Sequence, residues 1–144
     1  MAGNVDPVYS RVGNVSSDGS TAMAPTLTTA AADYTGISAN NKLVFTADAT
    51  NGSYIQKLRF KAVSTNAATV ARIYFNNGST NTTASNNSFF GEVSLPATTG
   101  VTTTATVEVD YPLNVALDPS FRIYVGLGAT VVGGWVITPV GGKY

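Results

Sequence analysis

The stretch YIQKLRFKAVSTNAATVARIYF, Tyr54 to Phe75, decides the fold, because the rest of the chain repeats its pattern. Its first half alternates apolar residues with cations. The apolar residues are Leu58, Phe60 and Ala62, and the cations are Lys57, Arg59 and Lys61. Because successive side chains of a strand point to opposite faces, this alternation predicts a strand with one apolar and one cationic face.

The second half of this stretch has the same period of two. Ala71, Ile73 and Phe75 form one row, and Val70, Arg72 and Tyr74 form the other. The residues between the halves, 64–66, are polar and typical of a turn. Two alternating runs joined by a short polar link predict a β-hairpin.

Similar short runs follow one another along the chain and are separated by turn-forming residues. They cover residues 25–35, 42–47, 89–95, 102–110, 121–127 and 133–140, with a polar loop at 76–88 and a connection at 111–120. In the run 89–95 we place Phe89 with Val93 and Leu95 on one face, and we expect Gly91 to mark a bulge or a close approach. With the hairpin this gives eight strands and no helix, which predicts an all-β fold, an eight-stranded jelly-roll-like antiparallel β-sandwich. An immunoglobulin-like sandwich also fits the pattern.

The composition excludes several kinds of site. The 144 residues contain no cysteine and no histidine, so disulfides, cysteine–zinc sites, histidine metal ligands and a Ser-His-Asp triad are ruled out. The only glutamates, Glu92 and Glu108, have no spacing that indicates a glycosidase pair. We therefore expect a protein that is not an enzyme and has no catalytic residue, no metal and no cofactor.

Charge and hydropathy limit the classes of partner that the chain is expected to bind. Charged residues make up 11% of the chain and the net charge is +0, which argues against a nucleic-acid partner, because such a partner would require a basic excess. No apolar run approaches the ~20 residues of a membrane helix, so we expect no membrane partner. Residues 1–24 lack a basic start followed by an apolar core, and we expect no secretory signal there.

Residues 1–24 differ from the rest, and we assign residues 25–144 to a single sandwich domain. Pro7, Gly13 and the β-branched residues disfavour a helix in the first segment, which predicts an extended arm. Its sizeable apolar residues include Val5, Val8 and Tyr9. Two interpretations stay open: a frayed terminus, or an arm that docks on a neighbouring subunit.

The cationic row also has two interpretations. Lys57, Arg59 and Lys61 could bind a phosphate or an acidic partner, or they could form a solvated strand face that discourages edge pairing. If Arg72 lies across the hairpin on the same face, the row becomes a patch of four cations, and a charged partner is then favoured.

The second half of the chain resembles small virion proteins of tailed bacteriophages, of the cement or decoration type. The resemblance covers residues 54–144 and is carried by IYFNNGSTN (73–81), NNSFFGEVSLPATT (86–99) and the run from YPLNVALDPS to GGWVITPVGGKY (111–144). It implies a structural protein that binds the outer surface of a phage capsid lattice, with the major capsid protein as partner. It also implies a homo-oligomer, often a trimer in such proteins, located on the capsid surface of the virion.

For that function we expect lattice contacts from Val5, Val8 and Tyr9 together with one sheet face. The alternative is a carbohydrate-binding or receptor-binding β-sandwich, such as a head fibre or an adhesin, with Tyr54, Tyr74 and Tyr124 exposed on one loop end or face. An extracellular filament subunit has the same composition and stays open as well.

Overall fold

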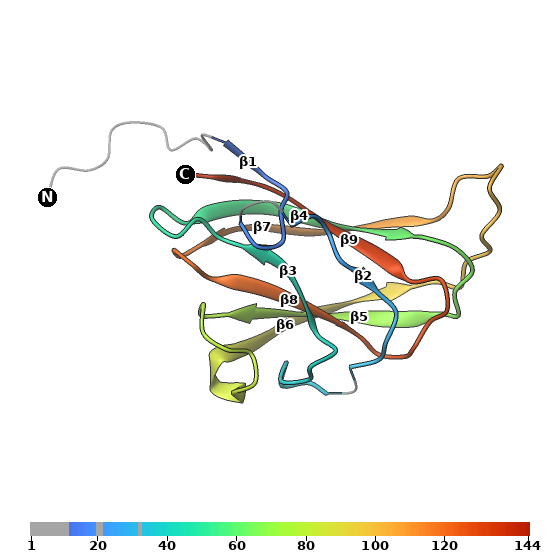
Figure 1. The fold of residues 1–144 in the computed structure, drawn as a ribbon, viewed down its shortest axis with the longest axis horizontal. Helices are drawn as coiled ribbons and strands as arrows, with labels where there is room; N and C mark the ends of the chain where they lie inside the picture. Colours follow the sequence, from blue (N-terminus) through green and yellow to red (C-terminus); the bar gives the residue numbers. More distant parts are fainter. Residues whose placement is uncertain (1–11, 20–21, 32) are drawn as a thin grey trace, which may run out of the picture.

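The computed structural model describes residues 12–19, 22–31 and 33–144. They form nine strands in two antiparallel sheets that pack face to face, and one short 3-10 helix, η1, at Ala84–Asn86 (Figure 1). The strands are β1 (Val12–Asn14), β2 (Thr26–Leu27), β3 (Lys42–Thr46), β4 (Ser53–Ala62), β5 (Thr69–Asn76), β6 (Asn87–Leu95), β7 (Glu108–Leu117), β8 (Arg122–Leu127) and β9 (Trp135–Lys143). The predicted all-β sandwich is confirmed. No helix in the described ranges is long and apolar enough to cross a membrane.

Strand pairing is nested: β2 pairs with β9, β3 with β8, β4 with β7, and β5 with β6, all antiparallel. One sheet has the order β1-β9-β4-β7, with β2 also on β9, and the other has the order β3-β8-β5-β6. β1 and β2 contact opposite ends of β9, so together they occupy the place of one strand. This explains why the structure has nine strands where the sequence predicted eight.

The core lies between the two sheets and is formed by the predicted inward rows. Its largest fully buried side chains include Trp135, Phe45, Phe60, Leu58 and Ile73. Burying apolar side chains of this size contributes about 1.5–3 kcal/mol each. Core burial is therefore the main stabilising term of the fold.

The predicted hairpin over 54–75 is wrong, because β4 and β5 lie in different sheets. Both strands alternate as predicted, but their apolar rows face each other across the core. Residues 63–68 therefore cross from one sheet to the other. The period of two indicates which face of a strand is buried. It does not indicate which strand is its hydrogen-bonded neighbour.

Asn66, which the sequence placed in a simple polar turn, is a buried clamp at this crossing. Its side-chain Nδ2 donates to the oxygens Ser64 O (3.2 Å), Thr98 Oγ1 (3.1 Å) and Gly134 O (3.2 Å). Its Oδ1 accepts from Gly134 N at 2.7 Å, and its backbone pairs with that of Thr98. One side chain thus joins three connections, those at 63–68, 96–107 and 128–134.

Two strands differ from their predicted bounds or phase. The strand expected at 102–110 lies instead at Glu108–Leu117, so it begins inside the predicted strand and covers most of the predicted connection at 111–120. In β6 the register shifts between the partners of Ile73 and Tyr74, which are Gly91 and Phe89. This bulge puts Phe90, rather than Phe89, on the same face as Val93. The bulge at Gly91 itself is confirmed.

Part of the predicted arm belongs to the sandwich. β1 pairs with the end of β9, and Asn14 Nδ2 donates to Thr46 O of β3 at 3.2 Å. Val5, Val8 and Tyr9, the arm residues predicted to contact a partner, lie outside the described residues.

Replacing Asn66 with alanine should lower the free energy of unfolding by about 2–4 kcal/mol, because it leaves the buried N–H of Gly134 without a partner and removes the amide's bonds to Thr98 and Gly134. The matched control is Asn77→Ala, whose amide bonds lie in an exposed loop and whose loss should cost about 0.5 kcal/mol or less. Urea unfolding of both variants measures the difference. Equal costs would contradict the clamp.

Deleting residues 1–20 should destabilise the fold more than deleting residues 1–11, by about 2–4 kcal/mol, because only the longer deletion removes the backbone bonds of β1 and the Asn14–Thr46 bond. Thermal unfolding of the two truncated chains makes the comparison. Identical midpoints would show that β1 adds nothing to stability.

Candidate interaction surface

The two lateral sides of the sandwich are built differently. On one side the chain after β1 closes the gap between the sheets: Thr46 Oγ1 of β3 donates to Ser17 O at 2.9 Å, and Ala31 N donates to Leu127 O at 2.7 Å. Figure 1 shows β2 and the segment after it running from one sheet to the other on the near side. On the far side β6 and β7 end the two sheets, and each pairs with one neighbour only among the described strands.

We call the β6–β7 side the open side, because its inward-pointing apolar side chains are only partly buried. They are Phe90 and Val93 of β6 and Val109, Tyr111, Leu113 and Val115 of β7. The same rows on β4, β5 and β8 are almost all fully buried. An apolar strip between two unpaired edges is typical of a protein-binding surface.

Aromatic contacts hold the open side together. Phe90 stacks on Phe75 with ring centroids 4.3 Å apart, and it meets the Tyr111 ring edge-on at 6.5 Å. A Cβ on Gly91 would collide with the Tyr111 hydroxyl, so any other residue there would force the Tyr111 side chain to move. This is the close approach that the sequence indicated at Gly91.

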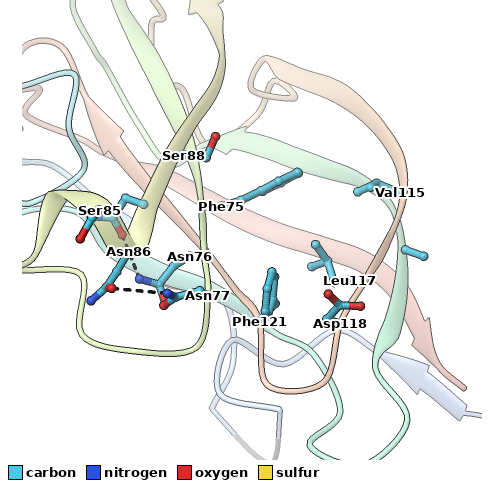
Figure 2. Close-up of a pocket in the computed structure, with 12 residues that line it drawn as sticks. Phe75, Asn76, Asn77, Ser85, Asn86, Ser88, Val115, Leu117, Asp118 and Phe121 are labelled. Atoms are coloured by element: carbon cyan, nitrogen blue, oxygen red, sulfur yellow. Dashed lines mark hydrogen bonds between the residues drawn. The ribbon is translucent and has the colours of Figure 1, made fainter.

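At one end the open side deepens into a depression of about 410 Å³, which we call the end pocket (Figure 2). Apolar side chains contributed by Phe75, Val115, Leu117 and Phe121 line it, and polar residues lie around them. The polar residues are Asn76, Asn77, Ser85, Asn86, Asn87, Ser88 and Asp118.

The four amides of the end pocket are already engaged with each other and with the 76–88 loop. Asn76 Nδ2 donates to Asn87 Oδ1 at 2.9 Å, and Asn77 Nδ2 donates to Asn86 Oδ1 at 3.3 Å. Their remaining donors and acceptors bond to backbone groups of the chain. The Asp118 carboxylate has no hydrogen bond or ion pair within the described residues. The pocket therefore offers apolar surface and one carboxylate rather than free amides.

The β7 edge carries features that oppose strand addition. Pro112 supplies no backbone N–H, and the register shift opposite Gln56 leaves Leu113 and Asn114 as a bulge, with Asn114 at φ 51°. Such features blunt an edge against pairing with another strand. A partner on the open side would therefore contact β7 through side chains rather than by extending the sheet of β7.

The cationic row lies on the outer face of β4, as predicted, and is largely neutralised by its neighbour β7. Asp110 accepts from Lys57 Nζ at 2.6 Å and from Arg59 Nε at 2.8 Å. Lys61 Nζ lies 3.6 Å from Glu108. The hydrogen bonds from Arg59, and then from Lys57, hold the pKa of Asp110 far below its usual range. Three cations facing two carboxylates leave little charge for a partner.

The predicted patch of four cations does not form, because Arg72 lies in the other sheet. Its side chain is covered by the segment at 30–36. Arg72 Nε donates to Glu92 at 2.9 Å, Nη1 donates to Ala31 O at 3.3 Å, and the guanidinium lies 4.3 Å from the centre of the Tyr34 ring. Arg72 thus fastens this segment onto the outer face of the β5 sheet.

The predicted tyrosine platform for sugars is also wrong. Tyr74 is fully buried, its hydroxyl donates to Asp33 O at 2.8 Å, and burial raises its pKa to about 12. Tyr124 lies beside Tyr74 in one sheet, whereas Tyr54 lies in the other, where its hydroxyl donates to Asn114 Oδ1. The three tyrosines therefore share no face.

The residues of the open side were not recognised from the sequence, although part of the signal was present. The apolar beat Leu113, Val115 and Leu117 was visible within the segment assigned to a connection. Pro112 directly precedes that beat, and a proline fits an edge strand, which is what the structure shows.

Among residues 12–19, 22–31 and 33–144, no group of three or more acidic or other metal-ligating side chains could hold a metal ion. Comparisons of the chain with protein-family models, with curated proteins and with solved structures found no match.

Two arginines with carboxylate partners provide a matched test of these ion pairs. The Arg72 side chain is 11% exposed and that of Arg59 is 42% exposed. We expect Arg72→Ala to cost about 3 kcal/mol, near the lower end for a buried pair because Glu92 is half exposed, and Arg59→Ala to cost about 1 kcal/mol or less. Urea unfolding gives both values, and the reverse order would contradict the assignment of Arg72 as a buried fastener.

Proposed function

We propose that this protein is a structural virion protein, a decoration or cement protein that binds the outer surface of a phage capsid lattice and stabilises it. The observation that carries the proposal is the open side, a strip of partly buried apolar side chains between two edge strands. The resemblance of residues 54–144 to small tailed-phage virion proteins points the same way. The major capsid protein is the proposed partner, and the capsid surface is the proposed location.

The mechanism would be mass action. A protein that binds the assembled lattice, and does not bind separated capsid subunits, stabilises the lattice by a free energy that grows with the logarithm of its free concentration divided by its dissociation constant. Such binding requires a surface that fits a protein partner and has little charge to desolvate. The open side meets this requirement, because the nearby charges on Lys57, Arg59 and Asp110 neutralise each other on the outer face of the sheet.

We also propose that the sandwich is a jelly roll. In that fold a long antiparallel hairpin winds into two sheets, so that successive nested pairs of strands alternate between the sheets in Greek-key order. The nested pairs from β2–β9 to β5–β6 support this proposal. Jelly rolls are common among viral capsid domains, and this gives the functional proposal a fold-level analogy in its favour.

Phe89 and Phe90 offer a matched pair for testing the proposed function. They are equally exposed, at 42% and 43%, but Phe89 lies on the outer face against Tyr34, whereas Phe90 lies on the open side. We expect Phe90→Ser to weaken capsid binding at least tenfold, which corresponds to about 1.4 kcal/mol, and Phe89→Ser to leave it within about twofold. Cosedimentation of each purified variant with phage capsid shells that lack the protein measures the binding.

Circular dichroism and thermal unfolding of both variants control for loss of fold. The proposal fails if the wild-type chain does not bind shells, or if Phe89→Ser and Phe90→Ser weaken binding equally. Binding to immobilised glycans in place of shells would favour the carbohydrate-binding alternative.

A further inference from the structure

The two strand edges of the open side differ in what they can accept. The β7 edge resists strand addition because of Pro112 and the bulge at Asn114. By contrast, residues 87–95 of β6 include no proline, lysine or arginine, and the one charge, on Glu92, lies on the outer face in an ion pair. Beyond its bulge, the ladder of β6 with β5 is regular over residues 91–95. This part of β6 is therefore an unprotected edge.

The pairing of β5 shows which backbone groups of this edge are free. The carbonyl of Val70 accepts from Gly128 N at 2.8 Å, so Val70 directs its backbone groups toward the β8 side, and Arg72, two residues on, does the same. Their partners in β6, Ser94 and Glu92, therefore direct their N–H and C=O groups away from β5. Within the described residues these groups have no hydrogen-bond partner.

A row of free N–H and C=O groups is recognised by another extended backbone, which presents acceptors and donors at the same spacing. The neighbouring side chains specify what that strand carries. On its inner side it would lie beside Val93 and across from Tyr111, whose hydroxyl lies against Gly91. On its outer side it would lie beside the half-exposed carboxylate of Glu92, which favours a basic residue there. A fitting segment therefore alternates apolar side chains, facing inward, with polar or basic ones.

A second copy of this chain is a poor source of that strand. Antiparallel pairing of two β6 edges about a two-fold axis also brings the two β7 edges together, because β6 and β7 end the two packed sheets on the same side. Pro112 and the bulge at Asn114 would then meet their own copies. The pairing would also bring two Glu92 carboxylates close together, which is unfavourable. A separate extended segment contacts β6 alone and meets neither obstacle.

We propose that the capsid partner contributes an extended segment of about five residues, which pairs with residues 91–95 and extends the β5 sheet by one strand. The inference rests on the proposed function and deepens it, because it assigns the chemistry of the contact. Backbone hydrogen bonds form at the β6 edge, and side chains alone pack against β7. The inward-facing side chains of the segment cover apolar surface that the chain leaves partly exposed at Val93 and Tyr111.

Proline at position 94 tests the backbone hydrogen bonds. Ser94→Pro removes an N–H that points away from β5, so the native ladder keeps its bonds. Ser94→Ala, the matched control, changes the same side chain and keeps the N–H. We expect Ser94→Pro to weaken cosedimentation with phage capsid shells that lack the protein by about tenfold or more, and Ser94→Ala to leave it within about twofold.

Hydrogen exchange on the wild type gives a second measurement, which holds even if Ser94→Pro fails to fold. In the free protein the amides of Glu92 and Ser94 point to solvent, whereas those of Val93 and Leu95 point toward β5. On shell binding we expect exchange at Glu92 and Ser94 to slow by about tenfold or more, because both amides become hydrogen-bonded.

The outcomes separate this inference from the proposed function. A wild-type protein that does not bind shells overturns both. If the wild type binds, a folded Ser94→Pro variant that binds equally well, or unchanged exchange at Glu92 and Ser94, overturns the added strand and leaves the capsid function standing. Light scattering of the free protein adds one further outcome. An oligomer that Ser94→Pro dissociates would show that the β6 edge joins copies of this chain, which also overturns the inference.

Discussion

The buried amide of Asn66 fixes the point on which the arrangement of strands depends. At residues 63–68 the chain leaves one sheet and enters the other, and a crossing of this kind would leave buried backbone groups without partners. Asn66 supplies such partners, because its side chain bonds to Gly134 N and O, to Ser64 O and to Thr98 Oγ1. With β4 and β5 held on opposite sides of the core, β6 pairs beside β5 and β7 beside β4. The open side is the direct consequence of this arrangement.

The asymmetry between the two sides follows from the order of the chain. Residues before β3 are available to cover the β1–β3 side, and they do so through Asn14, Ser17 and Ala31. The β6–β7 side is formed by strands from the middle of the chain. The only segment between β6 and β7 is the connection 96–107, and no further chain is available to cover this side. Its apolar row is left partly exposed, while Pro112 and the bulge at Asn114 protect the edge from strand pairing. Exposed apolar surface on a blunted edge is the physical basis for proposing a specific protein partner rather than aggregation.

How much the sequence could predict depended on whether the signal was local. Alternation correctly put Leu58 with Phe60 and Ala71 with Ile73 on one buried face of their strands, because the period of two reports the buried face of each strand. The pairing of β4 with β7 and β9 could not be predicted, because hydrogen-bonded neighbours and strands that face each other across the core give the same alternation. The phase error at Phe89 came from the bulge at Gly91, which adds one residue and exchanges the two faces. The open side could not be predicted for both reasons, the unknown strand pairing and the bulge. To recognise it, one must know which strands lie at the edges of the sheets.

The central claim is that the open side contacts the proposed capsid partner. Hydrogen exchange of the shell-bound protein, compared with the free protein, tests it residue by residue. We expect added protection to concentrate at β6 and β7 and at the residues around the end pocket, with the outer face of β4 unchanged at Lys57 and Arg59. Added protection confined to that cationic row, or to the segment that covers Arg72, with β6 and β7 unchanged, would contradict this claim.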